Sequence, residues 1–129
     1  MATDLKELSI SLLSTTTLSV RTAAATTLYT VPVGKRCVLD HVKVVCGTDA
    51  STTAVITFGK STALTDFLGS QTMTNLAATY DTVICAPIPN ATPVKTKSYA
   101  AADIIQVNVG TADVDGSTDA KVLLFGTLY

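Results

Sequence analysis

Residues 26–46, TTLYTVPVGKRCVLDHVKVVC, decide the expected fold of this 129-residue chain. A β-branched and aromatic run ends at a turn in which Pro32 fixes φ and Gly34 permits a conformation that other residues avoid. In the run that follows, 36–46, valines recur on one side of a strand with the period of two. Asp40 interrupts that alternation, which predicts a bulge or a strand end there. The stretch therefore predicts two strands joined by a tight turn.

The period of two recurs along most of the chain, whereas helical periodicity is scarce. Residues 59–79 are the least regular part, where either a short helix near 63–68 or a loop with two short strands fits the pattern. Asp115 and Gly116 stand between two alternating runs, which predicts a hairpin. Further strands are expected over 53–58, 80–86, 94–99, 103–109 and 121–129, with one or two within 9–21.

About eight strands with turn signals at short intervals predict an all-β fold, an antiparallel β-sandwich of jelly-roll type. We expect residues 1–15 to form an N-terminal arm or a first strand. Residues 16–129 are expected to form a single β-sandwich domain, which is long enough to bury its own core.

The composition disfavours charged partners. Only 15% of the residues are charged, the formal net charge is −1, and aromatic residues make up 5%. Neither nucleic acid nor a membrane is therefore an expected partner. Acidic residues stand where a signal peptide needs basic ones, and no stretch has the roughly 18 apolar residues of a membrane helix. We expect a soluble protein made in the cytoplasm.

Apparent catalytic motifs fail on spacing, so neither an enzyme nor a cofactor is expected. The segment 59–62, GKST, resembles the end of a phosphate-binding loop, but Ala54 stands where the first glycine belongs. His41 is the only histidine, and Cys37 would lie roughly 13 Å from it along a strand. We expect His41 to be a partly exposed strand residue. A jelly-roll enzyme of the cupin kind would need several metal-binding histidines.

Asp113, Asp115 and Asp119 resemble part of a calcium loop, because three carboxylates within seven residues can converge on a hard cation. Gly116 comes too early for an EF-hand, and the closing glutamate is missing. The three aspartates are therefore only weak metal candidates. Their simpler interpretation is a hairpin tip that acidic side chains keep soluble.

Three cysteines, without CxxC spacing, argue against a fully paired disulfide framework. Each lies in or beside an apolar strand, where a free thiol behaves as a small buried hydrophobe. We expect Cys37, Cys46 and Cys85 to be free, although a Cys46–Cys85 bridge stays open if their strands are neighbours.

Residues 27–35, TLYTVPVGK, resemble a run found in small β-sandwich proteins of tailed bacteriophages. There the run opens a strand, and a valine-rich strand and a small-residue loop follow; 36–46 and 47–53 match them here. The apolar closing strand around 122–126 is similar too, although the resemblance mainly covers 26–60. It implies a virion structural protein, either a capsid decoration (cement) protein, often trimeric, or a component of the tail, neck or fibre.

We therefore expect a homotrimeric capsid decoration protein that binds major capsid subunits on the outer surface of the virion and bridges them. The alternative is a tail, neck or fibre-associated module that recognises a host-surface glycan, for which only four tyrosines could stack on sugars. The closing strand is apolar on both faces, so it should bury one face against a partner. The expected assembly residues are Leu5, Leu8, Leu12, Leu13, Leu123, Phe125 and Tyr129.

Overall fold

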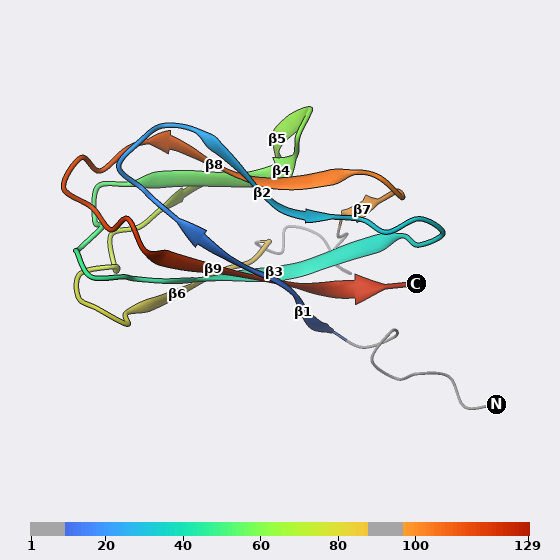
Figure 1. Cartoon of the computed structure of the whole chain (residues 1–129), viewed down its shortest axis with the longest axis horizontal. Helices are drawn as coiled ribbons and strands as arrows, with labels where there is room; N and C mark the ends of the chain where they lie inside the picture. Colours follow the sequence, from blue (N-terminus) through green and yellow to red (C-terminus); the bar gives the residue numbers. More distant parts are fainter. Residues whose placement is uncertain (1–9, 88–96) are drawn as a thin grey trace.

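The computed structural model describes residues 10–87 and 97–129, which form two antiparallel sheets packed face to face (Figure 1). Sheet A has the strand order β1-β9-β3-β6, with the short β7 also paired to β3. Sheet B has the order β2-β8-β4-β5. The strands are β1 (Ser11–Leu18), β2 (Ala25–Thr30), β3 (Cys37–Val45), β4 (Val55–Lys60), β5 (Ala63–Thr72), β6 (Thr82–Cys85), β7 (Ser98–Tyr99), β8 (Ile104–Thr111) and β9 (Ala120–Leu128).

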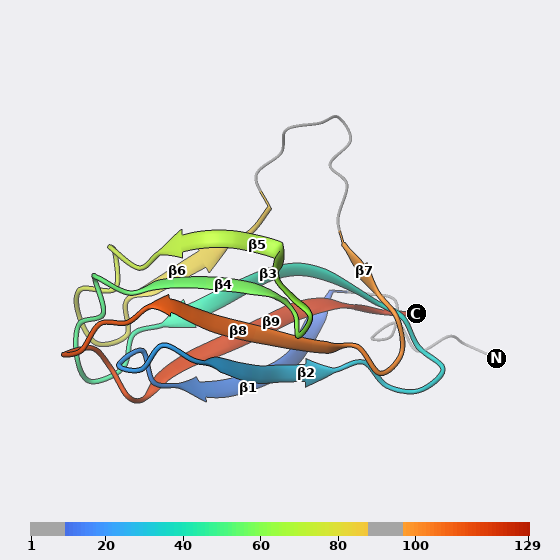
Figure 2. The ribbon, with the colours of Figure 1, turned by 90° about the horizontal axis from the view of Figure 1, so that it is seen from above.

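The strand order is that of a jelly roll. If the two-residue β7 is left out, eight strands remain, and β8 and β9 become the seventh and eighth in chain order. Sheet A then has the order first, eighth, third and sixth. Sheet B then has the order second, seventh, fourth and fifth, so most connections cross from one sheet to the other (Figure 1 and Figure 2). The all-β sandwich predicted from the sequence is confirmed.

The core lies between the sheets and comes from alternate residues of the central strands. Ile105, Val107 and Val109 of β8 are all buried, as their period of two predicts. The same holds for β4, where Ile56 and Phe58 are fully buried. The largest fully buried side chains include Tyr99, Phe58, Leu39, Ile56, Met73, Leu76, Ile105 and Leu124.

The irregularity predicted at Asp40 is a β-bulge in β3. Leu39 pairs with Gly126 of β9, but the next pair is His41 with Phe125, so Asp40 is the extra residue. The bulge resets the alternation, and it therefore explains why buried positions in β3 change parity at this point.

A second bulge faces the first across β9. In β1 the register shifts between Leu12 and Ser14, which leaves Leu13 as the extra residue. Both bulges adjoin Phe125 of β9. At the next residue, Gly126, a Cβ atom would lie 2.5 Å from the carbonyl oxygen of Val38 and 3.0 Å from Cδ1 of Leu13. The neighbouring strands of sheet A approach β9 this closely only because residue 126 has no side chain.

Residues 59–79 differ from both predictions made for them. They contain neither a helix nor two short strands but the ten-residue β5, which pairs with β4 in a hairpin. Two register shifts in that pairing disturb the alternation, so the neighbouring Phe67 and Leu68 are both buried. The GKST segment spans the end of β4 and the hairpin turn.

The hairpin predicted at Asp115 and Gly116 is wrong. β8 pairs with β2 and β4, whereas β9 pairs with β1 and β3, so this turn links the two sheets. The backbone of Val20, between β1 and β2, bonds to Asp113 and Ser117 on either side of the turn. Packing against another crossover therefore holds the turn, rather than cross-strand pairing.

Candidate functional site: an apolar sheet face and a hollow

The face of sheet A that points away from sheet B carries an apolar band. Leu12 of β1 pairs with Phe125 of β9. Leu123, two residues before Phe125 in β9, pairs with Lys43 of β3, and Lys43 also pairs with Ile84 of β6. Leu12 is 51% exposed and Ile84 is 66% exposed, whereas Leu123 and Phe125 are half-buried. We call Leu12, Phe125, Leu123 and Ile84 the outer band.

Polar neighbours hold the centre of the outer band in place. The His41 ring stacks on Phe125, with ring centroids 4.5 Å apart and planes inclined by 9°. The ammonium of Lys43 lies 5.5 Å from the centre of the same ring, within the range of a cation–π contact. Nδ1 of His41 lies 2.5 Å from Oδ2 of Asp40, the bulge residue. The side chain of His41 is 21% exposed, so its predicted partial exposure is confirmed.

The predicted assembly residues do not all share one surface. Leu12, Leu123 and Phe125 lie on the outer band, which extends to Ile84, a residue that the sequence did not single out. Leu13 instead packs against the core. Tyr129 is 51% exposed, and its hydroxyl lies 3.2 Å from Oγ of Ser98. Leu5 and Leu8 are outside the described residues.

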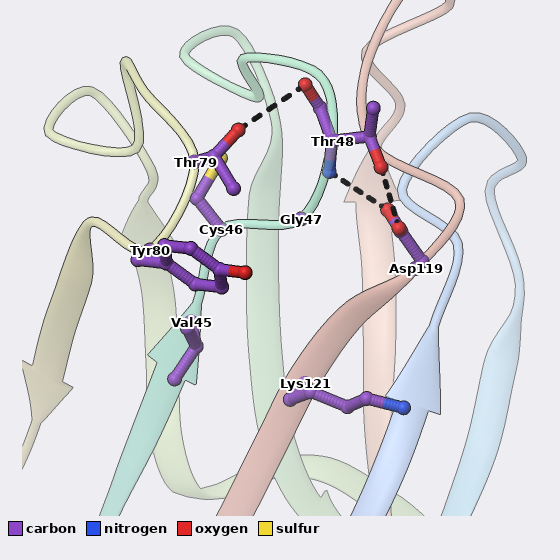
Figure 3. Close-up of a pocket in the computed structure, with 8 residues that line it drawn as sticks. All are labelled: Val45, Cys46, Gly47, Thr48, Thr79, Tyr80, Asp119 and Lys121. Carbon is purple, nitrogen blue, oxygen red and sulfur yellow. Dashed lines mark hydrogen bonds between the residues drawn. The ribbon is translucent and has the colours of Figure 1, made fainter.

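A hollow of about 320 Å³ opens beside the outer band, where β3 ends and β9 begins (Figure 3). Val45 and Lys121 pair across the two strands and form its floor. Tyr80, from the connection before β6, forms one wall, and Thr48 and Asp119 stand at the opposite side. The ring of Tyr80 is 82% exposed.

Hydrogen bonds fix the carboxylate of Asp119 at the rim of this hollow. It accepts bonds from the backbone N–H of Thr48 at 2.9 Å, from the Thr48 hydroxyl at 2.6 Å and from the Ser117 hydroxyl at 2.6 Å. The bonds from Ser117 and Thr48 hold the pKa of Asp119 well below its usual range. The site therefore contains a fixed anion whose position does not depend on a ligand.

Gly47 makes this arrangement possible. A Cβ atom at residue 47 would overlap Oδ1 of Asp119 and Oγ of Ser117, so only glycine lets the chain pass the carboxylate. The clue in the sequence is the glycine that follows a valine-rich strand. It did not reveal Asp119 as the partner, because 72 positions separate the two residues.

The three aspartates considered as metal ligands do not converge. Asp113 is buried and accepts bonds from the backbone N–H groups of Thr53 and Asp115, each at 3.2 Å. These bonds, the one from Thr53 first, lower the pKa of Asp113. The described residues contain no group of three or more His, Cys, Asp or Glu side chains that could hold a metal ion. Asp113 and Asp119 instead tie together loops at one end of the sandwich.

Calcium is accordingly expected to leave the stability of the protein unchanged. The carboxylates of Asp113 and Asp119 already accept internal hydrogen bonds, and a cation would have to displace them. We expect calcium or EDTA to move the melting temperature by less than about 1 °C, since a ligand that does not bind the native state cannot stabilise it. A calcium-dependent rise of several degrees in differential scanning calorimetry would contradict this assignment.

The three cysteines are free and buried, so the Cys46–Cys85 bridge that the sequence left open is not formed. Burial raises the pKa of Cys37 and of Cys85 to about 11. Their thiols are therefore neutral at physiological pH and poor nucleophiles. Within the described residues they contribute to packing rather than to reactivity.

No described segment forms a helix that is long and apolar enough to cross a membrane. Comparison of the chain with protein-family models, with curated proteins and with solved structures gave no significant match. The features of the chain that bear on its function are the outer band, the hollow and the resemblance of residues 26–60.

Proposed function

We propose that this protein is a structural component of a phage virion, a capsid decoration protein that self-associates and binds the outer capsid shell. In this proposal the protein is a homotrimer on the capsid surface and stabilises the shell by bridging major capsid subunits. The resemblance of residues 26–60 supports the choice of virion. The jelly roll, a fold common among viral structural proteins, is compatible with it.

The observation that carries the proposal is the outer band. Leu12 and Ile84 leave half or more of their side-chain surface in water, on either side of the half-buried Leu123 and Phe125. An apolar band of this kind on an ordered sheet favours burial against another protein surface. A repeated, symmetric contact would bury it in every copy at once.

Charged substitutions in the outer band are expected to dissociate the oligomer without unfolding the subunit. Leu12→Lys and Ile84→Lys act on exposed side chains, so each should change the free energy of unfolding by no more than about 0.5 kcal/mol. Light scattering after size-exclusion chromatography should give a trimer for the wild type and a monomer for the double variant. The double variant should also fail to cosediment with capsid shells.

Val114→Lys is the matched control, because Val114 is 75% exposed but lies in the turn between β8 and β9, outside the band. It should leave both the trimer and shell binding unchanged. A monomeric wild type would overturn the trimer. Electron microscopy of virions that lack the protein should reveal missing density on the capsid; a change confined to the tail would overturn the capsid assignment.

A second candidate function, a tail, neck or fibre-associated module that recognises a host-surface glycan, is favoured by one observation. Of the four tyrosines, Tyr99 is buried, Tyr29 is half-buried and Tyr129 is 51% exposed, whereas Tyr80 is 82% exposed beside the hollow. An exposed aromatic ring next to polar groups is suited to stacking on a sugar.

A further inference from the structure

The backbone of Tyr80 is strained in a way that its own packing does not explain. Its φ is +72°, a left-handed conformation that costs L-residues roughly 1–2 kcal/mol relative to glycine. A large residue in this region persists only where the surrounding structure holds it there. Here the ring is 82% exposed, and among the described residues its hydroxyl has no hydrogen-bond partner.

The backbone around Tyr80 is nevertheless tightly anchored. Its N–H donates to the carbonyl of Cys46 at 3.1 Å, and the N–H of Cys46 donates to the carbonyl of Asp81 at 2.7 Å. The carboxylate of Asp81 in turn accepts bonds from the N–H groups of Ala77 and Ala78. The backbone that carries the exposed ring is therefore fixed to the end of β3.

Two charged side chains, Asp119 and Lys121, lie on the side of the hollow opposite the ring. Figure 3 shows the hydroxyl end of Tyr80 directed toward the side of the hollow that carries Asp119 and Lys121. Oδ2 of Asp119 accepts a single bond, from the Thr48 hydroxyl, and so keeps capacity for a further donor. The ammonium of Lys121 donates to Thr17 at 2.5 Å and has two more N–H groups.

These features together select against most ligand classes. An anion such as phosphate would meet the fixed carboxylate of Asp119, and a cation would meet Lys121. A wholly apolar ligand would leave both polar groups without compensation. A sugar ring is neutral, offers a face of C–H groups to an aromatic ring and carries hydroxyls that both donate and accept along its edge. The volume of about 320 Å³ is at the lower end of ligand pockets.

We infer that the hollow between Tyr80, Thr48, Asp119 and Lys121 is a binding site for a neutral hexopyranose unit. Tyr80 would stack on the face of the sugar, Asp119 would accept a hydrogen bond from one hydroxyl, and Lys121 would donate to another. This site is independent of the assembly proposed for the outer band. It names the place and the ligand class that the alternative function would require.

Tyr80→Gly is the variant that tests the site. It removes the ring and relieves the left-handed strain, so it should weaken binding at least about tenfold while the melting temperature stays equal to or above that of the wild type. Ala102→Gly is the matched control, because Ala102 also has a positive φ, +70°, but lies in the turn between β7 and β8. It should relieve the same strain and leave binding unchanged.

Binding would be measured with a panel of neutral methyl hexopyranosides by chemical-shift titration of the isotope-labelled full chain. We expect shifts confined to residues 45–48, 79–82 and 119–121. Lys121→Met keeps the aliphatic part of the side chain and loses the ammonium, so it should weaken binding by several-fold. A parallel titration with polysaccharides built from the same sugars would show whether a terminal or an internal unit is preferred.

Two results would overturn this inference. The first is the absence of local shifts with every glycoside and every polysaccharide at millimolar concentration. The second is binding that Tyr80→Gly leaves unchanged, which would place the sugar elsewhere. Neither result depends on the oligomeric state, so a failure of the sugar site and a failure of the assembly proposal can be told apart.

Discussion

Gly126→Ala is expected to destabilise the protein by about 2–4 kcal/mol, because it inserts a methyl group where two bulged strands close on β9. The new Cβ would lie 2.5 Å from a backbone oxygen of β3, at Val38, and 3.0 Å from Leu13 of β1. Backbone atoms in the middle of a sheet cannot move without breaking the hydrogen bonds on either side. The strain should therefore be relieved only by partial separation of the strands.

Gly69→Ala is the control for this prediction. Gly69 also lies in a strand, β5, but nothing is within 4 Å of the position that its Cβ would occupy. We expect this change to alter the free energy of unfolding by no more than about 0.5 kcal/mol. Urea denaturation of both variants measures the difference, and a Gly126→Ala midpoint equal to that of the wild type would refute the close packing described at β9.

Alkaline pH is expected to destabilise the protein through its buried thiols. Burial raises the pKa of Cys37 and Cys85 from the ordinary value of 9.0 to about 11. An unfolded chain loses these protons near pH 9, whereas the folded chain keeps them up to pH 11. Their contribution is therefore complete below pH 9 and is lost as the pH rises through 11, by about 2 kcal/mol for each thiol at pH 11.

The measurement is the free energy of unfolding from urea titrations between pH 8 and pH 11 under reducing conditions. The Cys37→Ala/Cys85→Ala double variant is the control, and its stability should fall less steeply over this range. The slope should not vanish, because burial and a hydrogen bond to Asp66 raise the pKa of Tyr99 in the same direction. A wild type that is equally stable at pH 8 and pH 11 would contradict the prediction.

The sequence predicts the sandwich well because the central strands obey one simple rule. A residue that faces the other sheet must be apolar, and apolar residues accordingly recur at every second position in β4, β8 and β9. The bulge at Asp40 is readable for the same reason, since a single polar residue breaks an otherwise regular pattern. β5 is harder to recognise, because its pairing has two register shifts and the adjacent Phe67 and Leu68 are both buried.

Long-range contacts explain what the sequence does not reveal. The Asp115-Gly116 pair has the composition of a hairpin turn, but Val20 and Ser51 from other crossovers bond to its flanks and determine its role. The outer band was partly predictable, because Leu123 and Phe125 alternate with core residues. Ile84 was not, because β6 is short and its place beside β3 follows from topology alone.

The hollow was not predictable from any local motif. Its residues come from the end of β3, the connection before β6 and the start of β9, and no two of these segments are neighbours in the sequence. In the sequence Tyr80 is one of four tyrosines and the first residue of the strand predicted over 80–86, whereas in the structure it precedes β6. Tyr80 differs from the other tyrosines in its positive φ, and the amino-acid sequence does not indicate a positive φ at a tyrosine.

The start of β1 and the end of β9 lie at the same pole of the sandwich. Ser11 pairs with Gly126 near the C-terminal end of β9, so β1 starts and β9 finishes at the pole opposite the hollow (Figure 1). A fluorescent or enzymatic cargo fused after Tyr129 would therefore leave from one pole and keep the other unobstructed. The domain could likewise be attached to another protein at this pole while the hollow at the opposite pole stays accessible to a ligand.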